Sequence, residues 1–351
     1  MTPAYPIPRR KLGSTAAEVT TLGFGAAALG NLYRAIPDAT AQACLDAALD
    51  AGIGYVDTAP HYGQGLSERR VGQVLGKALS VRSGITLSSK VGRVLTPIAP
   101  PPVGTERHGF VDGDPFEPVF DYSYDGIMRS FESSLTRLQQ ERIDILLAHD
   151  LGTQTHGADD AAHLKAFLNG GYKAMRELKD QGAVSAIGLG VNEWQVCEEV
   201  MADADLDVIL LAGRYTLLEQ GALAGFLPLC EDRGVSVIVG GPFNSGILTG
   251  GDHYDYGRVP QDICDRVIKL KAVCAAHDVP LAAAALQFPL AHPAVAGVIP
   301  GMADAAEVAA NVALFARDMP SALWDDLKTE GLLHDRAPVP NTQTPKTRVL
   351  S

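Results

Sequence analysis

The sequence lacks any run of about 18 consecutive apolar residues, so we expect no membrane-spanning helix. Its first residues, MTPAYPIPRRKLG, lack the apolar core of a secretory signal peptide. Cysteine is scarce, and Cys44, Cys197, Cys230, Cys264 and Cys274 include no closely spaced pair of the kind that binds metal. Each lies in an apolar or helical context, so we expect free buried thiols, no metal site and a reducing cytoplasm.

Positive charge is also in short supply. The 351 residues include 29 Lys and Arg against 41 Asp and Glu, which gives a net charge of −12. This excess of acid disfavours nucleic acid and anionic membrane surfaces as partners, so we expect a small-molecule partner. With 46% hydrophobic and 20% charged residues, the chain has the composition of a compact protein with a large core. The oligomeric state does not follow from the sequence.

Short aliphatic runs alternate with longer amphipathic segments along most of the chain. This alternation is typical of repeated strand–helix units, whose strands lie parallel. We expect strands at Thr21–Phe24, Tyr55–Asp57, Thr86–Lys90, Ile143–His149, Ala186–Val191, Val208–Ala212, Val235–Gly240 and Ala296–Ile299. Helices are expected at residues 40–51, from an N-cap at Ser67, after Asp125, and at residues 262–277 and 304–316. Eight such units predict a closed (β/α)8 TIM barrel rather than an open doubly wound sheet.

Three segments fall outside this repeat. Residues 8–20 predict a small N-terminal β-hairpin before the first barrel strand. Residues 92–122 predict a long loop after the third strand, of a length that is typical of functional or disordered loops. The polar, proline-rich residues 334–351 predict a C-terminal extension on the surface. Because no linker or repeat divides the rest, we expect residues 1–333 to form a single barrel domain.

Polar residues stand where several of the expected strands end. Asp57, Lys90 and His149 are the last residues of their strands, Asn192 follows the fifth strand, and Tyr62 lies five residues after Asp57 on a glycine-rich turn. The carboxyl ends of the strands form the active face of a (β/α)8 barrel, so these side chains are expected to meet there. Each one alone could equally cap a helix or form a surface ion pair. Four such strand ends together favour a catalytic site.

These residue types suit proton transfer at an alcohol or a carbonyl. Tyrosine has an ordinary pKa of about 10 and is a poor acid or base at neutral pH. A neighbouring lysine ammonium favours the phenolate and is expected to lower that pKa, and an aspartate would hold the lysine in place. A histidine nearby could donate a hydrogen bond to a substrate oxygen. The set contains no activated serine or cysteine nucleophile and no cluster with metal-ligand spacing.

The segments VDTAPHYG, SSK and LLAHD resemble the signatures of the aldo-keto reductase family, and the resemblance extends from PRRKLG to about Leu333. It implies a catalytic tetrad of Asp57, Tyr62, Lys90 and His149. FDYSYDGIMRSFESSL, GLGVNEWQVC, LLAGRYTLLEQ, GGPFNSGIL and AAALQFPLAHPAVAGVIPG resemble more specifically the D-threo-aldose 1-dehydrogenase (L-fucose dehydrogenase) branch. That resemblance implies oxidation of the anomeric carbon of sugars such as L-fucose, D-arabinose or L-galactose to a lactone, with a nicotinamide cofactor.

The cofactor is expected across the barrel mouth rather than on a dinucleotide fingerprint, because Gly23, Gly25 and Gly30 do not have the GxGxxG spacing. The resemblance places the nicotinamide carboxamide at Asn192 and the pyrophosphate on the backbone of the loop Gly240–Leu248. It places the adenosine half on the segment that follows Ile299. The cofactor-binding residues that it implies are Asn192, Gly240, Pro242, Phe243, Asn244, Ser245, Gly246, Leu248, Gly301, Glu307 and Asn311.

The sequence departs from the family pattern at three places in this region. Ala212 stands where a glutamine is frequent, and Gly240 stands where an aromatic residue usually covers the nicotinamide, so Phe243 or Tyr215 is expected to cover that face instead. NADP-preferring relatives carry basic residues at the positions of Gly301 and Glu307. A carboxylate repels a 2′-phosphate but accepts a hydrogen bond from a ribose hydroxyl, so we expect a preference for NAD.

Several aromatic and basic residues on the loops of the active face could contact a sugar. Substrate contacts are expected from Tyr33, Arg93, Phe120, Trp194 and Arg214, although ordinary packing or a surface ion pair would explain each one alone. Within the family, a pyridoxal 4-dehydrogenase or a general aldehyde and ketone reductase is the alternative function. From another class, a non-catalytic nicotinamide-binding channel subunit is disfavoured by the intact tetrad.

Overall fold

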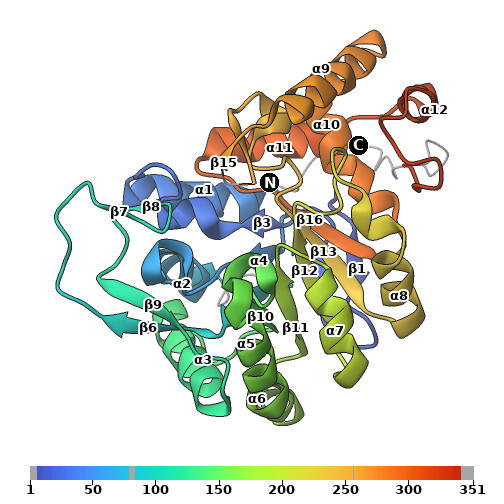
Figure 1. Cartoon of the computed structure of the whole chain (residues 1–351). Helices are drawn as coiled ribbons and strands as arrows, with labels where there is room; N and C mark the ends of the chain where they lie inside the picture. Colours follow the sequence, from blue (N-terminus) through green and yellow to red (C-terminus); the bar gives the residue numbers. More distant parts are fainter. Residues whose placement is uncertain (1–5, 79–83, 256, 341–351) are drawn as a thin grey trace.

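The computed structural model describes residues 6–78, 84–255 and 257–340. Eight parallel strands form its central sheet, in the order β16-β13-β12-β11-β10-β5-β4-β3, and helices surround them (Figure 1). The strands are β3 (Phe24–Gly25), β4 (Tyr55–Asp57), β5 (Thr86–Val91), β10 (Ile145–His149), β11 (Ala186–Val191), β12 (Val208–Ala212), β13 (Ser236–Gly240) and β16 (Val295–Ile299). The eight expected strands are thereby confirmed, with ends that differ by up to three residues.

The two edge strands of this sheet meet, so the sheet closes into a (β/α)8 TIM barrel. The amide of Gly23 donates to the carbonyl of Val298 at 2.9 Å, and the amide of Gly25 donates to the carbonyl of Pro300 at 3.0 Å. A parallel bridge also joins Leu22 to Val298. The first strand is shorter than the expected Thr21–Phe24 because residues before Phe24 contact β16 only through such isolated bridges.

The helices follow the strands as the alternation predicts. They are α1 (Asp38–Asp50), α2 (Leu66–Ala78), α3 (Tyr124–Leu138), α4 (Thr153–His156), α5 (Asp160–Ala166), α6 (Tyr172–Asp180), α7 (Gln195–Asp203), α8 (Phe226–Arg233), α9 (Gln261–Ala276), α10 (Leu281–Gln287), α11 (Ala305–Ala316) and α12 (Ser321–Thr329). The expected N-cap role of Ser67 is wrong, because α2 begins one residue earlier, at Leu66. Ser67 is buried, and its hydroxyl donates to the carbonyl of Ala26 at 2.7 Å.

Two apolar layers hold the barrel together. The larger one fills the space between the sheet and the helices. The smaller one fills the barrel interior with side chains that alternate along the strands, such as Ile145 and Leu147 of β10. The expected N-terminal hairpin is present as the antiparallel pair β1 (Arg9–Lys11) and β2 (Glu18–Thr20), and its Leu12 and Val19 join the smaller layer. The hairpin therefore packs against one end of the barrel interior.

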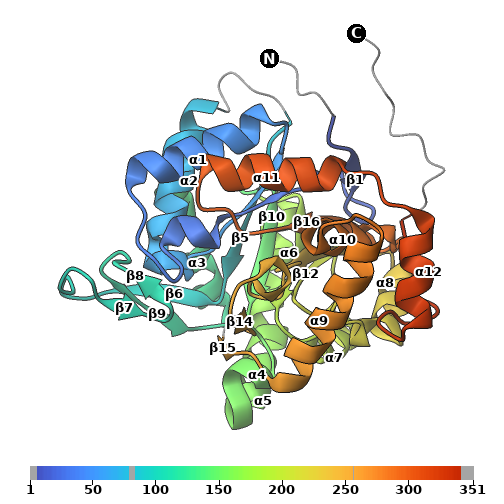
Figure 2. The ribbon, with the colours of Figure 1, turned by 90° about the horizontal axis from the view of Figure 1, so that it is seen from above.

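The expected long loop at residues 92–122 follows the third barrel strand, β5, but it contains four short strands. β6 (Arg93–Pro97) pairs with β9 (Phe116–Phe120) in an antiparallel ribbon, and β7 (Glu106–Arg107) pairs with β8 (Phe110–Val111). Both ribbons extend outward on the side of α2 and α3 (Figures 1 and 2). A third ribbon, β14 (His253–Tyr254) with β15 (Gly257–Arg258), lies after the seventh barrel strand.

The remaining sequence expectations concern membranes, cysteines and the chain end. In the parts of the chain that the structure describes, no single helix is both long and apolar enough to cross a membrane; α9 and residues 281–291 meet that test by length and composition only as a pair bent by 98°. All five cysteines are free thiols, and four are buried while Cys264 is half-buried. Residues 341–351 of the expected tail lie outside the described residues.

Candidate active site

Lys90 lies at the centre of the polar cluster at the carboxyl ends of the strands. Its Nζ lies 2.7 Å from Oδ2 of Asp57, 3.0 Å from the carbonyl oxygen of Thr58 and 3.0 Å from the hydroxyl of Tyr62. The side chains of Lys90 and Asp57 are 2% and 3% exposed, so this ion pair is withdrawn from water. Asp57 ends β4 and Lys90 lies one residue before the end of β5, and these strands pair directly, which is why two residues 33 positions apart meet.

Ser88 is a further member of this cluster. Ser88 lies two residues before Lys90 and therefore shares its face of β5. The Ser88 hydroxyl donates to Oδ1 of Asp57 at 2.6 Å, so both carboxylate oxygens of Asp57 are bonded. The sequence analysis missed Ser88, although its spacing from Lys90 could have indicated it. Gly190 on the neighbouring strand makes room for the lysine, because a Cβ there would lie 3.2 Å from Cε of Lys90.

Tyr62 reaches this cluster because two glycines let two turns approach each other. Gly63, which follows Tyr62, adopts a φ of +64°, a conformation that glycine adopts far more readily than other residues. A Cβ on Gly30 would lie 2.6 Å from the carbonyl carbon of Tyr62, and a Cβ on Gly63 would lie 2.4 Å from the carbonyl oxygen of Gly30. The close contact of these two turns therefore fixes the position of Tyr62 over Lys90.

His149 lies beside Tyr62, as the sequence predicts. The centroids of the two rings are 5.9 Å apart at an angle of 86°. Burial, followed by the charges of Lys90 and Arg93, lowers the pKa of His149 well below 6.5. The imidazole is therefore neutral near neutral pH, and a neutral imidazole carries one N–H donor that can bind a substrate oxygen. The structure thus brings all four residues of the expected tetrad into one cluster.

The expected lowering of the Tyr62 pKa is wrong for the structure as it stands. Burial raises this pKa well above 10, and the carboxylates of Asp57 and Asp150 act in the same direction, while Arg93 opposes them. The sequence analysis considered the lysine alone and missed the burial and the second carboxylate. At neutral pH Tyr62 therefore carries its proton, which suits a proton donor in reduction, and loss of that proton for oxidation becomes easier as the pH rises.

A cavity of about 670 Å³ opens beside Asp57 and Tyr62 at the barrel mouth. This size lies in the range of small-molecule and cofactor sites. Of the eleven expected cofactor-binding residues, ten line it, namely Asn192, Gly240, Pro242, Phe243, Asn244, Ser245, Gly246, Gly301, Glu307 and Asn311. Leu248 is the exception, since it is 1% exposed and packs in the large apolar layer. Its expected cofactor contact is therefore wrong.

Parts of the cavity wall present backbone rather than side chains. Several glycines line it, and a Cβ on Gly301 would meet nothing within 4 Å, so the backbone there is open to a ligand. The side chain of Asn244 is less available, because its Nδ2 donates to the carbonyl of Gly213 at 3.1 Å and its Oδ1 accepts from Thr216 at 2.7 Å. Asn244 therefore shapes the loop through its side chain and presents its backbone to the cavity.

Of the two aromatic residues expected to replace the missing one at position 240, only Phe243 lines the cavity. Tyr215 is fully buried and packs against Phe288, with ring centroids 5.4 Å apart. Gly240 has little room for a larger side chain, because a Cβ there would lie 3.1 Å from Leu210. The neighbouring side chain of Leu210 therefore leaves no space at position 240 for the aromatic residue that is usual in the family.

Glu307 lies at the far end of the cavity, near the beginning of α11. Its Oε2 accepts from the amide of Ala303 at 2.9 Å, and its Oε1 lies 3.5 Å from Nη2 of Arg34. Arg34 also lines the cavity. This region therefore presents a carboxylate paired with one guanidinium, which the sequence analysis did not anticipate.

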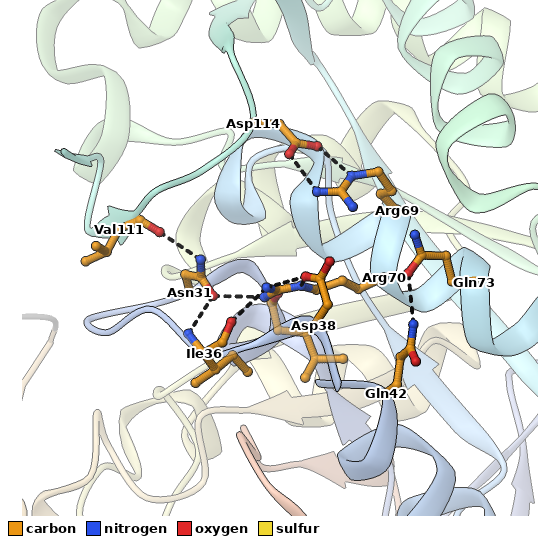
Figure 3. Close-up of polar contacts among 10 residues, drawn as sticks. Asn31, Ile36, Asp38, Gln42, Arg69, Arg70, Gln73, Val111 and Asp114 are labelled. Carbon is orange, nitrogen blue, oxygen red and sulfur yellow. Dashed lines mark hydrogen bonds and ion pairs between the residues drawn. The ribbon is translucent and has the colours of Figure 1, made fainter. Parts of the chain in front are cut away.

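A buried arginine holds the loop that carries Tyr33 and Arg34 (Figure 3). Arg70 of α2 is 4% exposed and donates to the carbonyls of Leu29 and Ile36 at 2.6 and 2.8 Å, and to Oδ1 of Asn31 at 2.8 Å. Its guanidinium also pairs with Asp38 at 2.7 Å. These bonds tie residues 29–38 to α2, and so fix one wall of the cavity.

The expected substrate residues lie in three different surroundings. Tyr33 lines the cavity, and its ring stacks on His253 with centroids 5.1 Å apart, so it lies among the expected cofactor-binding residues. Arg93 and Phe120 lie together beside the tetrad, with the guanidinium 4.4 Å from the ring centroid. The others are engaged elsewhere, Trp194 against Phe226 and Arg214 with Asp255 at 2.8 Å.

Histidines near this group are more buried than the sequence suggests. The rings of His156 and His163 lie 4.1 Å apart and pack against Phe120. His61 lies 5.9 Å from the His149 ring, and burial, followed by the charge of Arg93, lowers its pKa to about 2. Within the described residues no group of three or more His, Cys, Asp or Glu could hold a metal ion.

Fold and site together define an oxidoreductase of a known family. The family model for the aldo/keto reductase family matches residues 21–329, and the chain belongs to this family. Its relatives include pyridoxal 4-dehydrogenase of Microbacterium luteolum, which is 42% identical over 93% of this chain and 98% of the relative. D-threo-aldose 1-dehydrogenase of Pseudomonas sp is 38% identical over 90% of this chain and 95% of the relative.

A solved structure supports the same assignment. The holo form of aldo-keto reductase AKR11C1 from Bacillus halodurans is 28% identical to this chain and superposes with a TM-score of 0.71. The match covers 95% of this chain and 98% of that one. Aldo-keto reductases use nicotinamide cofactors, and the cavity beside Tyr62 has the size and open backbone that such a cofactor requires.

Proposed function

We propose that this chain is an NAD-dependent aldose 1-dehydrogenase that oxidises the anomeric carbon of sugars of the L-fucose, D-arabinose and L-galactose type to the lactone. The observation that carries the proposal is the contact of Lys90 Nζ with both Asp57 and the Tyr62 hydroxyl, at the edge of a cavity of about 670 Å³. The similarity to D-threo-aldose 1-dehydrogenase supports the choice of substrate.

In this reaction Tyr62 accepts the proton of the anomeric hydroxyl as the same carbon gives up its hydride. The bound nicotinamide supplies the hydride acceptor. Lys90 stabilises the phenolate through its contact at 3.0 Å, and Asp57 holds Lys90 in place at 2.7 Å. His149 donates its N–H to the substrate oxygen, which its neutral state allows. Asn192 and the backbone of residues 240–246 would hold the cofactor.

The preference for NAD rests on Glu307. Its carboxylate faces the cavity and accepts from Ala303, which leaves the oxygen that lies 3.5 Å from Arg34 to accept a ribose hydroxyl. A 2′-phosphate at the same place would meet this negative charge. Arg34 reduces the repulsion through its own charge, so we expect a preference rather than an exclusion. A larger kcat/KM with NADP than with NAD would contradict this part of the proposal.

Pyridoxal 4-dehydrogenase activity is the second candidate, and the 42% identity to the enzyme of Microbacterium luteolum favours it. A panel of L-fucose, D-arabinose, L-galactose and pyridoxal, each with NAD and with NADP, separates the two functions by the absorbance of the reduced cofactor. The aldose proposal predicts the highest kcat/KM with a sugar. The highest value with pyridoxal would overturn it, and turnover of simple aldehydes alone would indicate a general reductase.

A further inference from the structure

Asp150 is a buried carboxylate beside the tetrad that the proposed reaction does not yet use. It follows His149 directly, is 7% exposed and lies where β10 ends. Its Oδ2 lies 2.5 Å from Nη2 of Arg93 and 3.4 Å from Nε2 of His149. Its Oδ1 accepts from Nδ2 of Asn192 at 3.3 Å. One carboxylate therefore contacts the expected catalytic histidine, the expected carboxamide-binding residue and an expected substrate contact.

The backbone of Asp150 is held in a conformation that few side chains favour. Its φ is +55°, in the left-handed region that glycine adopts most readily. The amide of Asp150 donates to the carbonyl of Gly190 at 2.9 Å, which fixes this conformation against the neighbouring strand. Residues in such strained positions gather at functional sites.

We propose that Asp150 is a positioning residue, whose carboxylate keeps the single proton of neutral His149 on Nε2 and turns the amide nitrogen of Asn192 toward itself. The role of Asp150 in the reaction rests on the proposed function. The position of the proton on His149 does not, because it can be measured without substrate or cofactor.

The argument for His149 is electrostatic. A neutral imidazole carries its proton on one of two nitrogens, and an ionised carboxylate accepts hydrogen bonds but donates none. A negative charge at 3.4 Å from Nε2 therefore favours the tautomer with the proton on that nitrogen. The other nitrogen, Nδ1, is buried and has no hydrogen-bond partner among the described residues. No other group in this part of the structure selects the opposite tautomer.

The orientation of the Asn192 side-chain amide follows from the hydrogen bond that it donates to Asp150. Because the carboxylate of Asp150 only accepts, the Nδ2 group of Asn192 faces it, and Oδ1 of Asn192 is left to accept from a ligand. Asn192 lines the cofactor cavity, so this orientation presents an acceptor to the N–H donors of a carboxamide. Arg93 completes the arrangement, since its guanidinium balances the carboxylate at 2.5 Å.

The test uses the full-length chain and two substitutions of Asp150. Asp150→Asn removes the charge and keeps the shape, and Asp150→Gly removes the side chain and suits the positive φ. Asp207→Asn is the matched control, because the side chain of Asp207 is similarly shielded, 11% exposed against 10% for Asp150, and pairs with Lys179 at 2.7 Å away from the tetrad.

The first readout needs no substrate and no cofactor. Nitrogen NMR of the histidine rings, with the His149 signals assigned from a His149→Gln variant, reports which nitrogen carries the proton. We expect the Nε2–H tautomer in the wild type and in Asp207→Asn, and a mixture of tautomers in Asp150→Gly. The same Nε2–H tautomer in Asp150→Gly would overturn the proposal, even if the enzyme is inactive on every substrate tried.

The second readout is the pH profile of oxidation. The groups that face Tyr62 are Asp57, Lys90, Arg93, His149 and Asp150. Removing the negative charge at position 150 leaves Arg93 unopposed, and both changes favour the phenolate, so the rising limb of kcat/KM should move to lower pH. We expect the plateau value of kcat/KM to fall about 10- to 100-fold, as for other residues that orient catalytic groups.

A purely structural role for Asp150 would lower the melting temperature without moving the pH profile, and this result would refute the proposal. An unmoved profile is expected for Asp207→Asn. If the wild type oxidises neither sugars nor pyridoxal, the proposed function fails, while the NMR readout still decides the role of Asp150.

Discussion

Replacing Lys90 by methionine separates what this residue contributes to stability from what it contributes to chemistry. The ion pair between Lys90 and Asp57 is 2.7 Å long, and both side chains are at most 3% exposed. Methionine fills a similar volume but leaves the Asp57 carboxylate with only the Ser88 hydroxyl as its side-chain donor. Breaking a buried pair in this way is expected to lower the free energy of unfolding by about 3–5 kcal/mol.

The same substitution also lowers activity, and this loss is not reversed by removing the unpaired charge. The Tyr62 hydroxyl loses a cation that lies 3.0 Å away, which raises the pKa of Tyr62 further and moves the rising limb of the oxidation profile to higher pH. Turnover at neutral pH is expected to fall by a factor of about 100 or more. The double variant Asp57→Asn with Lys90→Met removes the unpaired charge, so most of the stability should return while the activity stays lost.

The assay combines urea unfolding with steady-state kinetics over a range of pH. Cofactor affinity, followed by quenching of protein fluorescence, controls for damage to the cavity. Recovery of both stability and turnover in the double variant would refute the reasoning, because it would show that Lys90 acts only through the fold. Full turnover by Lys90→Met alone would refute it as well.

Three further predictions concern the cofactor, acid stability and the cavity wall. Glu307→Lys should raise kcat/KM for NADP relative to NAD, because an ammonium replaces a carboxylate at the cavity; an unchanged ratio would contradict the role of Glu307. Burial lowers the pKa of His61 to about 2, so the neutral form stabilises the fold above pH 6.5 and this stability is lost at lower pH, by about 1.4 kcal/mol per pH unit for one proton. His61→Asn should reduce that slope in urea titrations. Arg70→Met should weaken cofactor binding more than it changes kcat, since Arg70 holds the loop of Tyr33 and Arg34; equal effects on both would contradict this.

The sequence predicts the barrel well because its strands are short, mostly aliphatic and separated by helices, and because charged or histidine side chains stand at or near the carboxyl ends of three of them. Asp57, Lys90 and His149 could be placed together for this reason, and the structure brings them into one cluster. The ribbon of β6 and β9 was missed because Pro97 and Pro118 interrupt its strand pattern, and pairing between residues 93 and 120 leaves no local signal.

The direction of the Tyr62 pKa shift could not be predicted from the sequence. Lys90 could be predicted as a neighbour that lowers this pKa, but the depth of burial and the carboxylate of Asp150 follow only from the packing of β6, β10 and the Tyr62 turn. Leu248 and Tyr215 illustrate the same limit. Each lies in a segment whose neighbours line the cavity, and only the path of the backbone shows that these two side chains face the core.

The central claim is that Tyr62, supported by Lys90, transfers the proton during oxidation of an alcohol. Its most direct test is a single-turnover measurement on Tyr62→Phe with L-fucose and NAD, with cofactor binding measured on the same sample. Tyr172→Phe is the matched control, because the Tyr172 hydroxyl bonds to the carbonyl of Asp205, away from the tetrad. We predict that Tyr62→Phe binds NAD normally and forms reduced cofactor at least about 100 times more slowly than the wild type and the control. Near-normal turnover by Tyr62→Phe, with normal binding, would contradict the account.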